Sequence, residues 1–264
     1  MGLRGFGVCV AIGTALLTAS GFAAEHADGT GAILVYHRFG LTAGSTTVSD
    51  AALDEQLAWL AAYVRVAPLR SVLDALGKRA HSSDRPCVAI TADDGHQSIY
   101  TDLYPRILRY RLPVTLFIYP SAISNAQYAL TWPELTEMVA SGLVDVQSHT
   151  YWHPNFEHEK ARRSPADYRA FVDTQLVRSK TVLETRIGRK VDMLAWPFAI
   201  YDQELESAAV KAGYTAGFIL GNRAVRPDTD RLALPRFWVS DSDRAARLAA
   251  RLATACPVQT QMKR

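Results

Sequence analysis

The sequence predicts an α/β protein, built as a single distorted (β/α) barrel with about seven parallel strands. From residue 30 onward, short apolar runs alternate with amphipathic stretches, which is the pattern of buried parallel strands joined by helices. No Pro/Gly/Ser-rich linker divides the 264 residues, and this favours one domain. An open, doubly wound sheet is the alternative, but the first strand lacks the G-x-G-x-x-G turn of dinucleotide-binding sheets.

The strand candidates are the apolar runs, and helices are expected between them. These runs occupy residues 32–36, 64–67, 87–91, 114–119, 143–147, 191–196, 215–220 and 237–239. Apolar residues recur at helical spacing from 53 to 64. Thr131 begins a capping box whose helix ends at Gly142, and Ser164 begins a long helix that ends near Gly188.

The first 24 residues have the pattern of a secretory signal peptide. Arg4 precedes an apolar run over residues 8–17, and small residues follow up to Ala23 and Ala24. A helix of about ten apolar residues spans only ~15 Å, half of a bilayer core. We therefore expect cleavage near residue 24, with an uncleaved membrane anchor as the alternative. Residues 25–264 would form an exported domain, periplasmic or secreted, without a stable membrane span.

The composition excludes some classes of partner and leaves the state of the cysteines open. The formal net charge is +3 and no basic block occurs, so the sequence gives no support for nucleic-acid binding. Cys87 opens an apolar run, which favours a buried free thiol. A bridge from Cys87 to Cys256 stays open as the other possibility.

Two adjacent carboxylates lie at the end of a strand candidate. Asp93 and Asp94 follow the run 87–91 and lead directly into Gly95. In a barrel, the groups just past the carboxyl ends of the strands form the active site. Adjacent acids at a strand end point in different directions, so one can bind a metal ion while the other acts on water. Capping of a helix that begins near Gln97 is the alternative for these acids.

Two histidines follow another strand candidate at a separation of four residues. His149 and His153 would lie on one side of a helical turn that Pro154 ends. A structural pair is the alternative for these two residues alone. Together with one carboxylate they provide three ligands and an open position for water, which is typical of a catalytic metal site. This set indicates metal-assisted hydrolysis of an acyl bond.

Two further strand ends carry candidate residues. His37 follows the run 32–36 and could serve as a general acid on the same face of the barrel. A purely structural histidine is the alternative. Pro197 and Phe198 follow the run 191–196, at the same end of the predicted barrel.

These motifs together resemble the polysaccharide deacetylases of carbohydrate esterase family 4, also called the NodB-homology family. Three segments of this chain resemble the three motifs of the family, in the same order. Thr91-Ala92-Asp93-Asp94-Gly95 resembles the T-F-D-D-G motif, and His149-Thr150-Tyr151-Trp152-His153-Pro154 matches the H-[ST]-x-x-H-P motif. The third motif is resembled by Trp196-Pro197-Phe198. Two further segments resemble the branch of the family that deacetylates poly-β-1,6-N-acetyl-D-glucosamine. They are Val35-Tyr36-His37-Arg38-Phe39 and Leu234-Pro235-Arg236. The resemblance covers roughly residues 30–240.

The resemblance implies a function and a role for each site residue. The implied reaction removes N-acetyl groups from an N-acetylglucosamine polymer and releases acetate, with exopolysaccharide export machinery as an expected partner. Asp93 would be the general base, His37 the general acid, and the backbone N–H of Phe198 a donor to the oxyanion. A divalent metal ion, zinc or else cobalt or nickel, would be held by Asp94, His149 and His153.

One departure from the family pattern concerns the residue that orients the base. The family places an Arg shortly before the Pro of its third motif, whereas this chain has Ala195 before Trp196. Arg236 could supply that guanidinium. We also consider Arg236, Trp152 and Trp196 as contacts for the sugar, because aromatic rings can stack on sugar faces.

Three other functions remain to be compared with this one. A peptidoglycan or chitooligosaccharide N-deacetylase would use the same chemistry on another glycan. An inactive carbohydrate-binding domain of the same fold is opposed by the intact Asp93, Asp94, His149 and His153. A nucleotide-dependent oxidoreductase would need a phosphate-binding loop that the first strand lacks.

Overall fold

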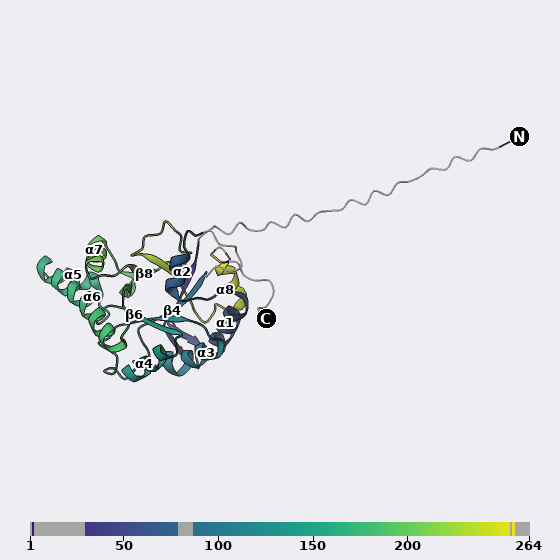
Figure 1. Ribbon diagram of the computed structural model, residues 1–264, viewed down its shortest axis with the longest axis horizontal. Coiled ribbons are helices and arrows are strands. Elements are labelled where there is room, and N and C mark those ends of the chain that lie inside the picture. Colours follow the sequence, from purple (N-terminus) through teal and green to yellow (C-terminus); the bar gives the residue numbers. More distant parts are fainter. Residues whose placement is uncertain (1, 3–29, 79–86, 254, 257–264) are drawn as a thin grey trace.

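Seven parallel strands close into a barrel in the computed structural model, which describes residues 2, 30–78, 87–253, 255 and 256 (Figure 1). Around the barrel they follow the order β1 (Ala32–Tyr36), β4 (Val88–Asp93), β5 (Val114–Ile118), β6 (Val144–Ser148), β7 (Met193–Ala195), β8 (Ala216–Leu220) and β9 (Leu234–Trp238). Two short strands, β2 (Arg38–Gly40) and β3 (Thr47–Ser49), pair with each other. The predicted barrel is confirmed. The predicted signal peptide, residues 1–24, lies outside the described residues except for Gly2.

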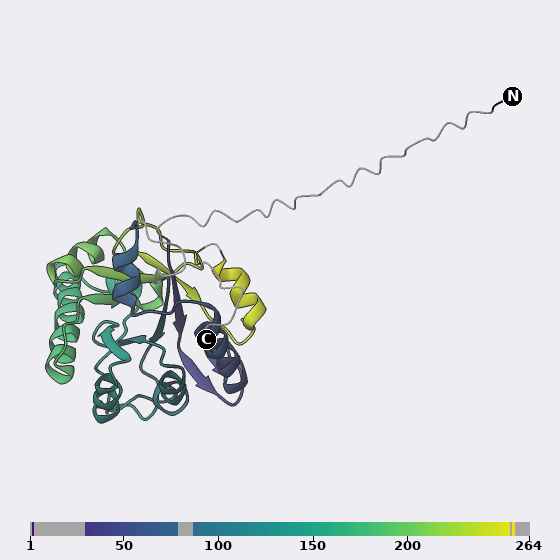
Figure 2. The ribbon, with the colours of Figure 1, turned by 45° about the vertical axis from the view of Figure 1, so that its right-hand side comes forward.

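Helices surround the strands. They are α1 (Asp50–Tyr63), α2 (Leu69–Ala75), the π-helical turn η1 (Ile99–Leu103), α3 (Tyr104–Tyr110), α4 (Trp132–Ala140), α5 (Phe156–Ala161), α6 (Pro165–Ile187), the 3₁₀ turn η2 (Pro197–Ala199), α7 (Gln203–Lys211) and α8 (Ala245–Leu252). Helices α6 and α7 lie together on one side, and α1 and α8 on the other (Figure 2). Within the described ranges, no helix is both long and apolar enough to cross a bilayer.

The predicted helix signals are present at the helix ends. The hydroxyl of Thr131 accepts a hydrogen bond from the backbone of Glu134, and the Glu134 carboxylate accepts one from the Thr131 backbone, which completes the capping box. Ser164 caps α6 by accepting a hydrogen bond from the Asp167 backbone. Gly188 ends α6 in the left-handed region, at φ 67°, a conformation that glycine adopts without a steric penalty.

The prediction of a strand at residues 64–67 is wrong. Val66 makes only a single parallel bridge, to Val88. Strand β4 is hydrogen-bonded to β1 on one edge and, from Ile90 onward, to β5 on the other, so this segment can pair only with the entrance of β4 at Val88. Pro68, which has no backbone N–H, follows directly and begins the entry into α2.

The expectation of a free thiol at Cys87 is also wrong. Cys87 forms a disulfide with Cys256 across a Cα–Cα distance of 5.4 Å, which lies within the usual range for disulfides. The bond joins the entrance of β4 to the segment that follows α8. Cys256 is therefore joined covalently to the strand that carries the adjacent carboxylates.

Alternation along the strands separates two apolar layers. Inside the barrel lie residues such as Ala89 and Leu234, whereas the residues next to them in sequence pack against the helices. Successive side chains of a strand point to opposite faces. Asp93 and Arg236 share the faces of Ala89 and Leu234, so both side chains point into the barrel at its carboxyl end.

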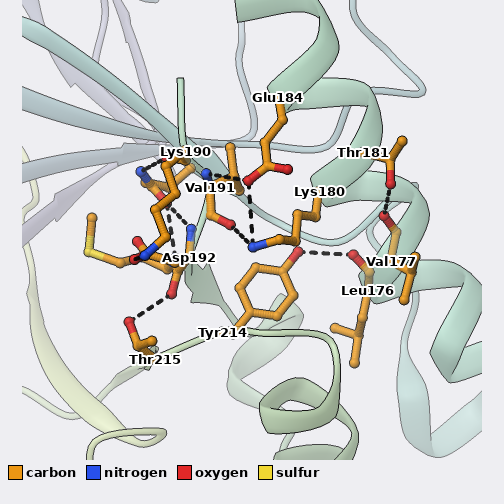
Figure 3. Close-up of polar contacts among 12 residues, drawn as sticks. Leu176, Val177, Lys180, Thr181, Glu184, Lys190, Val191, Asp192, Tyr214 and Thr215 are labelled. Carbon is orange, nitrogen blue, oxygen red and sulfur yellow. Dashed lines mark hydrogen bonds and ion pairs between the residues drawn. The ribbon is translucent and has the colours of Figure 1, made fainter. Parts of the chain in front are cut away.

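A polar network fixes the entrance of β7 against α6 (Figure 3). Lys180 donates a hydrogen bond to the carbonyl of Val191, and Glu184 accepts one from the Val191 N–H at 3.0 Å. The buried carboxylate of Asp192 lies 2.8 Å from the ammonium of Lys190. These contacts set the position of the strand that leads into the cleft described next.

Candidate functional site

A cleft of about 230 Å³ opens at the carboxyl end of the barrel. It contains eight of the nine predicted site residues. Its lining comprises His37, Thr46, Asp93, Asp94, His149, His153, Trp196, Phe198, Ala199, Leu220, Arg236 and Trp238. Trp152 is the predicted site residue that does not line it.

Strand register brings these residues together. Tyr36 of β1 lies beside Ala92 of β4, so His37 and Asp93 leave the barrel next to each other. Strand β6 ends at the register of Ile118, and His149 follows at once. Because all the strands are parallel, these ends meet on one face.

Asp93 is held by Arg236. The two terminal nitrogens of the guanidinium donate to the two carboxylate oxygens at 2.7 and 2.6 Å, and both side chains are only 2% exposed. Burial alone would raise the pKa of Asp93, but the charge of Arg236, the nearby His149 and the hydrogen bonds outweigh it and hold that pKa at about 2. Asp93 is therefore ionised at neutral pH.

Asp94 faces two histidines. Its backbone is left-handed, at φ 72°, and the Asp93 carboxylate also approaches one of these histidines, with Oδ2 3.9 Å from Nε2 of His149. One carboxylate oxygen of Asp94, Oδ1, lies 3.6 Å from Nε2 of His149 and 3.6 Å from Nε2 of His153. Within the described part of the chain, this is the one group of three such side chains that could hold a metal ion, with the donor atoms all within 4.8 Å of one another.

His149 is a neutral imidazole with one ring nitrogen available to bind. Its Nδ1–H donates a hydrogen bond to the carbonyl of Ala195 at 2.8 Å, which leaves the lone pair of Nε2 facing Asp94. Burial lowers the pKa of His149 to about 3 and also lowers the pKa of His153. Neutral imidazoles with one nitrogen fixed from behind, beside a carboxylate, fit a divalent metal ion.

The segment between the two histidines does not form the predicted helical turn. Thr150 and His153 have φ values of 64° and 63°, which no α-helix contains. The prediction that both imidazoles lie on one side holds, because the ring centroids are 4.6 Å apart. The spacing was informative, but the turn that produces the arrangement is left-handed.

Left-handed backbone is concentrated around the cleft. Non-glycine residues rarely adopt positive φ, and each such residue carries a steric cost. The described chain has eight of them, and five lie in the cleft lining or the histidine turn. These are Asp94, Thr150, His153, Phe198 and Ala199. Such strain is typical of functional sites, where the surrounding structure fixes unusual conformations.

His37 lies against Trp238, with ring centroids 4.4 Å apart. Burial lowers the pKa of His37. Trp238 lies two residues after Arg236 on β9, so strand alternation could have predicted that both face the cleft. Phe198 is 60% exposed and meets the ring of His153 edge-on, with centroids 4.7 Å apart.

The three predicted sugar contacts differ in exposure. Trp152 is 46% exposed and can offer its ring to a ligand. Trp196 is only 2% exposed, and its indole N–H donates to the carbonyl of Leu232 at 2.8 Å, so it packs in the core instead of presenting a ring face. Arg236 is equally buried and is paired with Asp93. Of the two suggested uses of Arg236, the geometry favours orienting Asp93 over contacting a sugar.

Comparison with known proteins also indicates a polysaccharide deacetylase. The family described as Polysaccharide deacetylase matches residues 80–217, more than half of the chain. The chain is 24% identical over 200 residues to a poly-β-1,6-N-acetyl-D-glucosamine N-deacetylase of Staphylococcus aureus (strain MRSA252) and 28% identical over 207 residues to one of Staphylococcus epidermidis. Each comparison covers 74% of this chain and 68% of the relative.

Solved structures show the same fold. A Streptococcus pyogenes deacetylase, PplD, in complex with acetate has a TM-score of 0.74 at 20% identity, and covers 86% of this chain and 99% of its own. IcaB from Ammonifex degensii has a TM-score of 0.70 at 24% identity, and covers 86% and 98%. The chain thus belongs to the polysaccharide deacetylase family and is a hydrolase that removes acetyl groups from an N-acetylated polysaccharide.

Proposed function

We propose that this chain is a metal-dependent N-deacetylase of poly-β-1,6-N-acetyl-D-glucosamine. The observation that carries the proposal is the position of Asp93, an ionised carboxylate fixed by Arg236, in the same cleft as the Asp94-His149-His153 set. The staphylococcal relatives named for this activity support the choice of substrate.

Asp94, His149 and His153 would hold the metal ion, which is zinc in our proposal, with cobalt or nickel as substitutes. A bound divalent ion would polarise the acetamide carbonyl and increase the acidity of water. The fit depends on donor chemistry, since two neutral imidazoles and a carboxylate converge there. The carbonyl of Ala195 keeps His149 in the tautomer that such a site requires.

The remaining residues would move protons and stabilise charge. Asp93 would take a proton from water as the oxygen attacks the acetyl carbon. The backbone N–H of Phe198 would donate to the oxygen that becomes negative. His37 would then protonate the sugar nitrogen as the C–N bond breaks, because an amine leaves poorly until it is protonated. Acetate and a glucosamine unit would be the products.

Binding of the polymer would extend beyond the cleft. Trp152 is exposed close to the histidine turn and packs edge-on against Phe171, with ring centroids 6.1 Å apart. A ring held in this way can stack on the apolar face of a sugar at little cost in side-chain entropy. We propose that it contacts a neighbouring sugar of the chain.

We also propose that residues 25–264 act outside the cytoplasm after removal of residues 1–24. The disulfide between Cys87 and Cys256 supports this location, since such bonds persist in oxidising compartments. The polymer would reach the enzyme at the export machinery.

The proposal is tested by measuring acetate release from three glycans. Purified protein is incubated with poly-β-1,6-N-acetylglucosamine, chitooligosaccharides or peptidoglycan fragments, after chelation and after addition of Zn²⁺, Co²⁺ or Ni²⁺. We expect metal-dependent release from the β-1,6 polymer and none in the Asp93→Asn variant. Release confined to chitooligosaccharides or peptidoglycan would overturn the substrate assignment. Release that persists after chelation would overturn the metal assignment.

A further inference from the structure

The turn that carries His149 and His153 has a conformation that its own residues disfavour. Thr150 and His153 have φ values of 64° and 63°. For side chains with a Cβ this region is sterically costly, most of all for a β-branched residue such as threonine. Contacts from elsewhere in the chain must therefore stabilise the turn.

The backbone N–H groups of this turn are bonded to side-chain oxygens. Thr150 donates to Oγ of Ser148 at 3.1 Å, and His153 donates to Oγ1 of Thr150 at 3.2 Å. Both of these acceptors belong to the same segment. The N–H of Trp152 instead donates to Oε1 of Gln175, on α6, at 3.1 Å. Gln175 is only 3% exposed, so this hydrogen bond is shielded from water.

Gln175 belongs to a row of α6 side chains that contact this region. Arg178 and Ser179 follow it by three and four residues, the spacing of neighbours on one helix face. The guanidinium carbon of Arg178 lies 4.1 Å from the ring centroid of Tyr151. Oγ of Ser179 lies 2.8 Å from Oγ of Ser148. One face of α6 thus contacts both the end of β6 and the turn.

We infer that Gln175 is a positioning residue for the metal-binding turn. By accepting from Trp152 it fixes the backbone immediately before His153, and so keeps Nε2 of His153 beside Asp94. The inference rests on the proposed function, because it attributes metal affinity to a side chain that does not itself bind the ion. Loss of a group that orients metal ligands typically weakens metal affinity by about 10- to 100-fold.

The test compares metal affinity among variants of the full chain. Gln175→Met keeps the length of the side chain but has no acceptor oxygen, whereas Gln175→Glu keeps one. Leu183→Ala is the matched control, because Leu183 is buried on the same helix about two turns further on. The measurements are Zn²⁺ titration against a competing chelator and the visible absorption spectrum with Co²⁺, neither of which depends on deacetylation.

We expect Gln175→Met to raise the Zn²⁺ dissociation constant about 10- to 100-fold and to alter the Co²⁺ spectrum. Gln175→Glu should bind Zn²⁺ with an affinity within about threefold of wild type. Leu183→Ala should lower Tm and leave the Zn²⁺ affinity unchanged. Wild-type affinity in Gln175→Met would overturn the inference.

A second variant keeps the test decisive if Gln175→Met does not fold. Arg178→Ala changes an exposed side chain and removes only its contact with Tyr151. Affinity that is about two- to fivefold weaker supports positioning by this face of α6, and unchanged affinity contradicts it. A wild-type chain that binds neither Zn²⁺ nor Co²⁺ would overturn the metal assignment of the proposed function, and the inference with it.

Discussion

Arg236 holds Asp93 from 143 residues away in sequence, with each of its two terminal guanidinium nitrogens donating to one of the two carboxylate oxygens. Their two strands border β1, and the pair meets inside the barrel. This pair explains how a buried carboxylate stays ionised, and we propose that Arg236 takes the place of the arginine that the family's third motif normally supplies.

Arg236→Lys should move the pH dependence of the reaction. Lysine keeps the positive charge but cannot make two parallel bonds, so burial should raise the pKa of Asp93 above its present value of about 2. Since the base acts in its ionised form, the acidic limb of the kcat profile should shift to higher pH, and kcat at pH 7 should fall about tenfold.

Arg70→Lys is the control for this substitution. Arg70 makes a comparable two-point contact with the buried Asp192 at the entrance of β7, at 2.6 and 3.3 Å. That variant should lose stability without a change in the kcat profile. An acidic limb that stays in place in Arg236→Lys would show that the pair does not control the base.

The metal-free protein should lose stability as pH falls from about 6.5 toward 3. Burial lowers the pKa of His149 from 6.5 to about 3, so in this window the unfolded chain takes up a proton that the folded chain does not. The free energy of unfolding should fall by about 1.4 kcal/mol per pH unit for each such histidine. Urea unfolding at pH 7, 6 and 5 after chelation measures this slope. His149→Gln should have a shallower slope, and equal slopes would contradict the assignment.

His37→Gln should impair catalysis without weakening metal binding. Removal of a general acid typically costs about 10²- to 10⁴-fold in kcat, and His37 is not one of the three proposed ligands. The comparison is with His158→Gln, which alters an exposed histidine on α5 and should retain full activity. Equal kcat in the two variants would exclude His37 as the acid.

Trp152→Ala should affect binding of the polymer more than the chemical step. Loss of a stacked ring should raise KM for long substrate about two- to tenfold, with kcat nearly unchanged. Trp59→Ala serves as the control, since Trp59 is a part-buried tryptophan on α1 that packs beside Tyr63. Identical KM values for the two variants would place the sugar elsewhere.

Reduction of the disulfide should destabilise the protein. The bond between Cys87 and Cys256 closes a segment with a sequence separation of 169, and its loss should cost about 2–4 kcal/mol of unfolding free energy. Urea unfolding with and without a reductant measures this change. The double variant Cys87→Ser/Cys256→Ser should match the reduced protein and be insensitive to the reductant. If the reductant leaves the free energy of unfolding of the wild-type protein unchanged, the bond does not stabilise the fold.

The sequence alone determined the order of the elements and the end of the barrel at which the chemistry lies. Apolar runs and capping residues are local signals, and the capping box at Thr131 and the termination at Gly188 appear where they were predicted. Since parallel strands end on a common face, the order of the elements by itself assigns Asp93, Asp94 and His149 to one site.

Only the tertiary structure decided how these residues meet. The pairing of Asp93 with Arg236 depends on closure of the barrel, which brings β4 and β9 to either side of β1. The turn that carries His153 is contacted by Gln175 of α6 and by the backbone N–H of Ser121. Trp196 is buried, with its indole N–H bonded to the carbonyl of Leu232. Residues 64–67 form a single bridge instead of a strand because β5 pairs with β4 from Ile90 onward and leaves only the entrance of β4 open. All of these outcomes depend on distant partners, whose positions local propensity does not encode.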